Sequence, residues 1–287
     1  MSLTSTPSTA AANAPEKSTR AAYKVTPARV LRSEWSKFWS LRSTWIAVGL
    51  SLVFVVAFGL IFAARYKSHI TAGVTPGAQQ EDRFASATAV SLSLFGVNFG
   101  QLVLGVLGVL VTAGEYSTGM IRSTLAAVPR RLPVLWSKAI VCGLVALVVG
   151  SVAAFASFGI GSRIITGTPA ALALSSTGVV RSLFGAGIYL ALVAIIGVAL
   201  GSLLRSAAAG IAVLLGVLLL VPGLVSLLPT SWAQNVSQYL PSNAGDSIQA
   251  LTRATHTLSA GAGLAVLLGW TVLALAAAAW RLMRSDA

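Results

Sequence analysis

Six apolar stretches constrain this chain more than any other feature, because each is long enough to cross a lipid bilayer as a helix. A helix needs about twenty apolar residues to span a hydrocarbon core of roughly 30 Å. The stretches cover approximately residues 44–64, 85–113, 134–161, 179–204, 207–228 and 258–280. Transmembrane β-barrels use shorter segments of alternating hydrophobicity instead. The sequence therefore predicts an all-α, polytopic membrane protein with six transmembrane helices.

The composition agrees with this class. Of the 287 residues, 56% are hydrophobic and only 9% are charged, which is too little polar surface for a soluble domain of this size. The formal net charge of +13 does not predict nucleic-acid binding, because the lysines and arginines lie between apolar segments rather than on one soluble face. Residues 1–27, rich in Ser, Thr, Ala and Pro, are expected to form a disordered tail without the apolar core of a signal peptide.

The distribution of basic residues predicts the orientation. The N-terminal arm, the loop between the second and third spans, the link between the fourth and fifth, and the C-terminus hold 14 of the 20 lysines and arginines. Cytoplasmic segments carry such an excess. Both termini are therefore expected in the cytoplasm, in agreement with an even number of spans.

The segment before the first span, residues 28–43, has the pattern of an interfacial amphipathic helix. Its aromatic residues fall near one helical face and its serines and cations near the other. The expected membrane anchors are Trp35, Phe38, Trp39, Lys37 and Arg42. Glu34 is expected to pair with Lys37 or Arg32 at the surface, where such a pair contributes little. A generic membrane anchor would explain the same pattern.

The loop between the second and third spans also predicts a short amphipathic helix, covering residues 115–129. Ile121, Leu125 and Val128 recur at helical spacing, and Pro129 ends the helix before Arg130 and Arg131. Glu115 is expected to face water, Arg122 or a partner protein, because a carboxylate facing lipid is costly. An ordinary basic cytoplasmic loop is the alternative interpretation.

Few polar groups lie within the spans. Asn98 and Gln101 are three residues apart on the second span, where they would either bond a neighbouring helix or line a cavity. No paired carboxylates lie at mid-depth, which argues against a proton-coupled antiporter. The one cysteine, Cys142, and the two histidines show no metal-ligand spacing, so we expect no metal site and no catalytic residues.

The long loop at residues 229–257 is expected on the outer side. Tyr239, Leu240, Ile248 and Leu251 are apolar enough to return to the membrane interface, which predicts short helices lying on or dipping into the outer leaflet.

The order of these elements resembles the permease subunits of type-2 ABC exporters, particularly the actinobacterial ones. The matching motifs are RSEWSK at 32–37 with LRSTW at 41–45, GEYSTGMIRSTL at 114–125 with PRR at 129–131, and YLPSNAG at 239–245. Together with the six spans, the resemblance covers residues 28 to 284. It implies a transmembrane domain over residues 28–287 with the type-2 exporter fold, in a bacterial plasma membrane.

The resemblance also implies a division of labour between polypeptides. The permease would pair with a separate ABC ATPase and a second permease copy, as a homodimer. Residues 28–43 would be the connecting helix, and residues 115–129 the coupling helix that docks on the ATPase. The coupling residues would be Glu115, Tyr116, Met120, Ile121, Arg122, Leu125, Arg130 and Arg131.

The chain itself contains no G-x-x-x-x-G-K-[ST] phosphate loop. It is therefore expected to be a transport subunit rather than an enzyme, without a cofactor of its own, since the partner would bind ATP and Mg²⁺. The shortage of charge in the spans predicts outward movement of a hydrophobic or amphipathic compound, such as a drug, an antibiotic or a lipid. The alternative is a structural or regulatory membrane protein that transports nothing.

Overall fold

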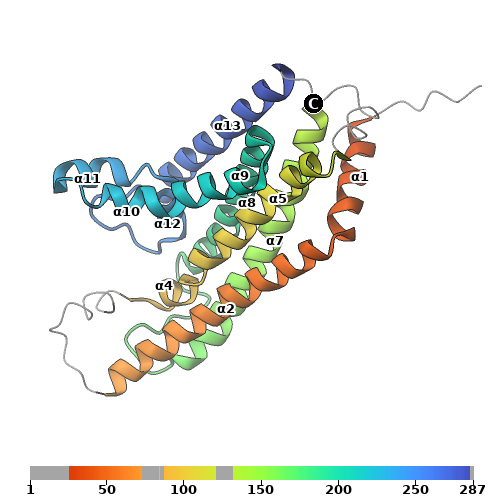
Figure 1. Ribbon diagram of the computed structural model, residues 1–287. Coiled ribbons are helices and arrows are strands. Elements are labelled where there is room, and N and C mark those ends of the chain that lie inside the picture. The colour runs from red at the N-terminus through yellow and green to blue at the C-terminus, as the bar shows by residue number, and fades with distance from the viewer. Residues whose placement is uncertain (1–25, 73–83, 85–86, 121–131, 285–287) are drawn as a thin grey trace, which may run out of the picture.

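The computed structural model describes residues 26–72, 84, 87–120 and 132–284, and within these ranges it is helical without β-strands. Figure 1 shows the helices as an elongated bundle, with α1 against one end of it. The elements are α1 (Pro27–Ser40), α2 (Arg42–Thr71), α4 (Ala89–Leu94), α5 (Val97–Ser117), α7 (Leu132–Ile164), α8 (Val179–Leu204), α9 (Ala207–Leu215), the π-helix η1 (Gly216–Leu220), α10 (Val221–Val225), α11 (Thr230–Ser237), α12 (Pro241–Gln249) and α13 (Ala260–Arg284).

The six predicted spans are confirmed as helices long and apolar enough to cross a membrane. They are α2, α4 with α5, α7, α8, the continuous run from α9 to α10, and α13. The helices extend beyond the predicted apolar runs at several ends. The second span reaches Ser117 rather than residue 113, whereas the fifth ends at Val225 rather than residue 228. Hydropathy does not locate the end of the second span because polar residues continue this helix beyond the apolar run.

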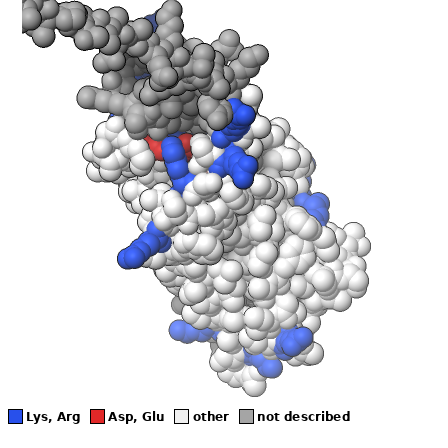
Figure 2. Space-filling model, turned by 90° about the vertical axis from the view of Figure 1, so that its right-hand side faces the viewer, with Lys and Arg blue, Asp and Glu red and all other residues white. Residues whose placement is uncertain are grey.

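Helix α8 is the centre of the bundle. It packs against α5 and α7. Of its apolar 18-residue membrane-spanning stretch, 72% is buried inside the protein. The same measure is 22% for α2, 17% for the fifth span and 28% for α13, so these three helices leave most of their apolar surface uncovered. Figure 2 shows one face that is mostly uncharged, with its lysines and arginines scattered toward the two ends. A lipid bilayer would cover such a surface.

Small residues allow α5 and α8 to approach closely. A Cβ atom added at Gly108 would lie 2.2 Å from the Ala194 carbonyl oxygen, and one at Gly197 would lie 2.2 Å from the Gly105 carbonyl oxygen. Gly201 fits against Val109 in the same way. The GxxxG pattern of the fourth span, Gly197 and Gly201, therefore packs within the monomer.

The fifth span changes its helical geometry before its C-terminal end. Five residues, Gly216–Leu220, form a π-helix, and Pro222 follows at the start of α10. A proline removes one backbone donor from the helix, which disturbs the hydrogen bonding of the preceding turn. The irregularity of the fifth span beside Pro222 therefore takes the form of a π-helix.

Two short helices occupy the predicted outer loop, as expected from its apolar residues. Leu240 and Ile248 are buried where α12 packs on α8 and α13. The Arg181 guanidinium of α8 donates to the carbonyl oxygens of Ile248 at 3.3 Å and Ala250 at 2.7 Å, which satisfies the C-terminal end of α12. This segment is therefore fixed to the bundle by packing and by hydrogen bonds.

The close approach of α5 and α8 generates a stability prediction. Gly108→Ala should lower the free energy of unfolding by about 1–3 kcal/mol, because the new methyl group would meet backbone that cannot rotate away. Gly269→Ala is the matched control, since nothing lies within 4 Å of a Cβ atom there. Thermal unfolding in detergent measures both. Equal midpoints for the two variants would contradict the packing described for α5 and α8.

Candidate functional site

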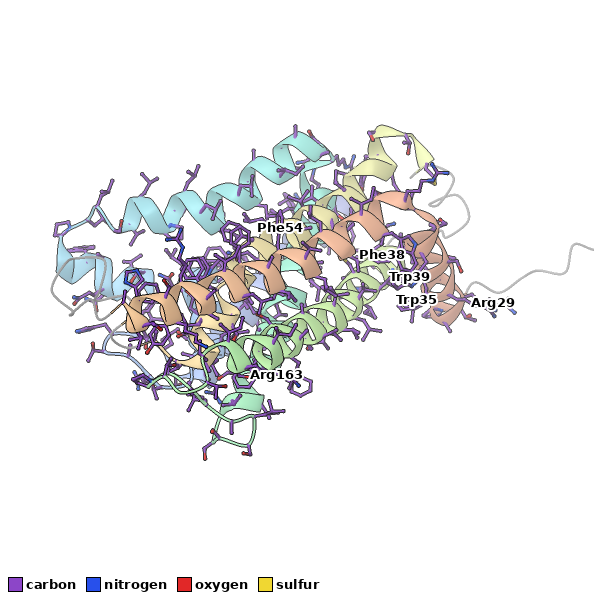
Figure 3. The ribbon with its side chains drawn as sticks, turned by 90° about the horizontal axis from the view of Figure 1, so that it is seen from below. Arg29, Trp35, Phe38, Trp39, Phe54 and Arg163 are labelled. Carbon is purple, nitrogen blue, oxygen red and sulfur yellow. The ribbon has the colours of Figure 1, made fainter. Side chains whose placement is uncertain are left out.

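A sharp bend joins α1 to α2. Leu41 has extended backbone geometry, with ψ of 124°, between the two helices. The rings of Trp39 and Trp45 lie 4.6 Å apart across the bend, and the Trp45 indole donates to the Trp39 carbonyl oxygen at 3.1 Å. Figure 3 shows Trp35, Phe38 and Trp39 together on α1. Arg42, predicted as part of the interfacial helix, instead lies in the first turn of α2.

The buried face of α1 differs from the predicted apolar face. Val30, Glu34 and Phe38, each four residues apart, are buried, and the helix packs mainly against α7. Trp35 is 40% exposed, on a face that bilayer lipid could contact. The expectation of a weak surface ion pair at Glu34 is wrong, because only 4% of this residue is exposed. A carboxylate therefore occupies a position that the helical pattern alone would assign to an apolar residue.

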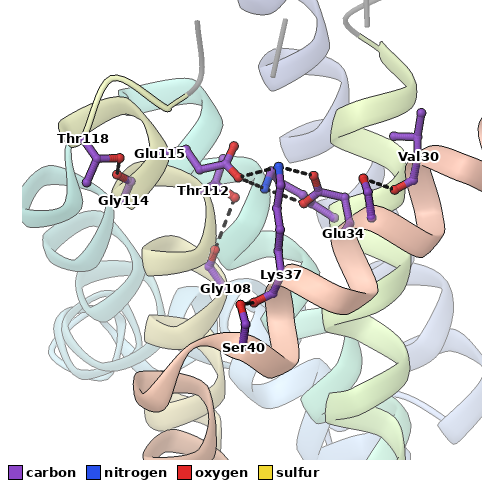
Figure 4. Close-up of polar contacts among 11 residues, drawn as sticks. Val30, Glu34, Lys37, Ser40, Gly108, Thr112, Gly114, Glu115 and Thr118 are labelled. Atoms are coloured by element: carbon purple, nitrogen blue, oxygen red, sulfur yellow. Dashed lines mark hydrogen bonds and ion pairs between the residues drawn. The ribbon is translucent and has the colours of Figure 1, made fainter. Parts of the chain in front are cut away.

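Four charged side chains from three helices form an ionic cluster, which is the candidate functional site. Lys138 of α7 donates to Glu34 Oε2 at 2.6 Å and to Glu115 Oε1 at 2.7 Å. Lys37 donates to Glu34 Oε1 at 2.9 Å and to Glu115 Oε1 at 3.3 Å. Figure 4 shows these contacts between α1 and the end of α5. The ionic cluster thus connects the interfacial helix to the second and third spans.

Burial makes the cluster energetically demanding. The side chains of Lys138, Glu34 and Glu115 are 3%, 4% and 8% exposed, whereas Lys37 is 35% exposed. Removing charges from water costs several kcal/mol for each ion, and close opposite charges offset that cost only with good geometry. Each lysine here contacts both carboxylates, so the two positive and two negative charges balance locally.

Lys37, which lies outside the spans, keeps its charge in this setting. Burial lowers its pKa, but the hydrogen bond and charge of Glu34 and the charge of Glu115 raise it more, so the net pKa lies above 10.5. A lysine whose pKa is higher in the folded than in the unfolded state stabilises the fold at every pH below its unfolded-state pKa. This stabilisation is lost only as the pH rises through the folded-state pKa. The Lys37 contribution is therefore fully present at neutral pH.

The predicted coupling residues lie in two different environments. Glu115 and Tyr116 belong to the last turn of α5, and Glu115 is buried against lysines of α1 and α7 rather than facing water. The Arg205 guanidinium lies over the Tyr116 ring, 5.2 Å from the centre of that ring. Met120 is 45% exposed. The remaining predicted coupling residues, Ile121, Arg122, Leu125, Arg130 and Arg131, lie outside the described residues.

Asn98 and Gln101, which were expected either to bond a neighbouring helix or to line a cavity, lie in different environments. Gln101 is buried and accepts a hydrogen bond from the Tyr189 hydroxyl of α8. Asn98 is exposed, and its amide donates to the Phe95 carbonyl oxygen of the preceding turn. Gln101 therefore joins two helices, which was one of the two alternatives.

Sequence reasoning missed Lys138. It was counted only among the loop charges that set the orientation, although it follows the start of an apolar run and lies in the second turn of α7. A lysine and a glutamate at the ends of two consecutive spans, on the same side of the membrane, are a recognisable signal for pairing. The connection to Glu34 has no such signal, because the two residues are 104 positions apart.

Metal-ligand chemistry finds no support among the residues that the structure describes. No group of three His, Cys, Asp or Glu side chains in these ranges could hold a metal ion, and Cys142 is a buried free thiol. Comparison of the chain with models of protein families and with curated proteins finds no match. The helical fold and the ionic cluster are therefore the grounds for a functional proposal.

The ionic cluster generates a prediction about its members. Lys138→Met should destabilise the protein by about 3–5 kcal/mol, because it leaves two buried carboxylates with one lysine. Adding Glu34→Gln and Glu115→Gln should recover part of this loss, since the uncompensated charges are then removed. Thermal unfolding of the single and triple variants measures the effect. Lys67→Met, at an exposed position of α2, is the control, and a loss of equal size there would argue against the cluster.

Proposed function

We propose that this chain is the membrane-spanning permease subunit of an ATP-driven type-2 ABC exporter. The observation that carries the proposal is the ionic cluster, which connects an amphipathic helix before the first span to the inner ends of α5 and α7. The segment between α5 and α7 is the one that resembles a coupling helix. Movement of that segment by a docked ATPase would pass to α1 and to two spans through the same four charges.

The working unit in this proposal contains four chains. Two ATPase subunits bind ATP and Mg²⁺, since the sequence has no phosphate loop of its own. Two copies of this chain form the membrane part as a homodimer. The weakly buried α2 and fifth span leave apolar faces that a second copy and lipid would share.

The passenger in this proposal is hydrophobic or amphipathic. An apolar pocket of about 250 Å³ lies between α8, the fifth span and α13, with walls that include Val193, Leu214 and Trp270. Apolar lining of this kind favours apolar ligands over sugars or inorganic ions. Export of a drug-like, antibiotic-like or lipid molecule fits these properties.

The proposed orientation places both termini in the cytoplasm of a bacterial cell, and labelling tests it. The native Cys142 is 1% exposed, so a new cysteine would be the reactive one. In intact cells, an impermeant maleimide should label Trp232→Cys, and it should reach Met120→Cys only after the cells are opened. Both positions are accessible, with 69% and 45% of the native residues exposed. Labelling of Met120→Cys in intact cells would overturn the orientation and the exporter proposal together.

The partner ATPase is tested by co-expression of this chain with an ABC ATPase from the same organism. The two proteins should co-purify, and after reconstitution hydrophobic compounds should stimulate ATP turnover whereas small ions should not. Arg122→Glu, in the proposed docking segment, should reduce co-purification at least about tenfold. The reason is that reversing the sign of a charge at an interface costs more than about 1.4 kcal/mol of binding free energy.

Arg65→Glu is the matched control, because it reverses a charge at the opposite end of the bundle. Its co-purification should equal that of the unmodified chain. No association in the unmodified protein would favour the alternative of a structural or regulatory membrane protein. Equal association of both variants would contradict the placement of the docking segment at Arg122.

A further inference from the structure

A cavity of about 390 Å³ lies between the bend at Leu41 and the end of α5. All four residues of the ionic cluster, Glu34, Lys37, Glu115 and Lys138, contribute to its lining, and Leu110 and Val111 contribute an apolar wall. The cavity therefore combines buried charge with a hydrocarbon surface. It differs from the apolar pocket beside α8, which lacks charged lining residues.

One acceptor in the cluster has no donor. Glu115 Oε1 accepts hydrogen bonds from both lysines, whereas Glu115 Oε2 is buried without a hydrogen-bond partner among the described residues. Both carboxylate oxygens of Glu34 accept from lysines. A buried carboxylate oxygen without a donor has lost its hydration without compensation, so an entering donor would gain a strong hydrogen bond.

The surroundings select the chemical class of that donor. An entering anion would meet two buried carboxylates whose lysines already donate to them, whereas a cation with N–H groups would meet an unsatisfied negative oxygen. Charge-assisted hydrogen bonds of this kind are stronger than neutral ones. An ammonium group therefore fits the head of the cavity better than a phosphate or a sulfate.

The apolar wall selects the remainder of the ligand. Val111 lies four residues before Glu115 on α5, so it faces the same side one turn farther into the membrane. Leu110, beside it, is 40% exposed at the bundle surface. Hydrocarbon attached to an ammonium at Glu115 could pass along these two side chains toward the middle of the bilayer.

We propose that this cavity binds the ammonium head of an amphiphile, which donates to Glu115 Oε2 while its hydrocarbon chain lies along Leu110 and Val111. The proposal goes beyond the exporter function and does not depend on an ATPase partner. The ammonium belongs either to an aminophospholipid or to a hydrophobic amine, which share this chemistry.

The test uses the purified full chain and counts bound amphiphile by native mass spectrometry. Dodecylamine, protonated at neutral pH, is compared with dodecanol, which has no charge, and with dodecyltrimethylammonium, which has no N–H donor. Dodecylamine should bind at one molecule per chain and at least about tenfold more tightly than both, as expected for a hydrogen bond to a charged group. Equal binding of the three probes would overturn the proposal.

Two variants separate the ligand site from the stability of the cluster. Glu115→Gln should abolish the preference for dodecylamine. Because this change also affects the lysines, Val111→Trp provides a second test that fills the cavity and leaves all four charges in place. It should weaken dodecylamine binding about tenfold. Val148→Trp, at a position of α7 that is 54% exposed, is its control and should bind normally. Normal binding by Val111→Trp would contradict the site.

Competition identifies the source of the ammonium. Displacement of dodecylamine by phosphatidylethanolamine, but not by phosphatidylcholine, would support a lipid headgroup as the occupant. Retention of dodecylamine against both lipids would support a hydrophobic amine. Displacement by phosphatidylcholine as effectively as by phosphatidylethanolamine would show that N–H donation is irrelevant and would overturn the proposal.

Discussion

Charge that is removed from water must find opposite charge, and this requirement organises one end of the molecule. Glu34, Glu115 and Lys138 belong to three separate helices and are buried. Lys138 lies against both carboxylates, so the opposite charges compensate one another. Moving any one of these helices away would leave a charge uncompensated in a medium of low dielectric constant. The bundle therefore tolerates α1 in a narrow range of positions, even though the bend at Leu41 has little regular backbone structure to hold it.

The six spans could be predicted from the sequence because the hydropathy of a segment directly indicates whether lipid or water surrounds it. The ionic cluster could not, because it depends on which helices become neighbours. Glu34 and Lys37 are close in sequence and were paired correctly, but their contact was assigned to the surface. The partners that bury Glu34 come from α7, which only the folded arrangement brings there. A count of basic residues treats Lys138 as a loop charge and so conceals its buried position.

Helical periodicity likewise locates a face without identifying what covers it. The aromatic pattern of α1 was evident, yet the residues that contact the bundle are Val30, Glu34 and Phe38, and Trp35 remains exposed. Gln101 and Asn98 are close on α5, but Tyr189 of α8 reaches only Gln101. From the sequence alone, glycines at helical spacing on α5 and α8 do not tell whether close packing occurs within one chain or between chains. Their contacts resolve this for Gly108 and Gly197, which are used inside the monomer.

The π-helix of the fifth span has a consequence for motion. A π turn accommodates one more residue than an α turn, so the residues after Gly216–Leu220 no longer follow the angular register of α9. The residues of α10 are not buried, so few contacts oppose a return to α-helical geometry. Such a return would rotate the C-terminal end of this span by about 100° about its own axis, as expected for one residue of an α-helix. This end of the span can therefore change the side chains that it presents while α5, α7 and α8 keep their packing.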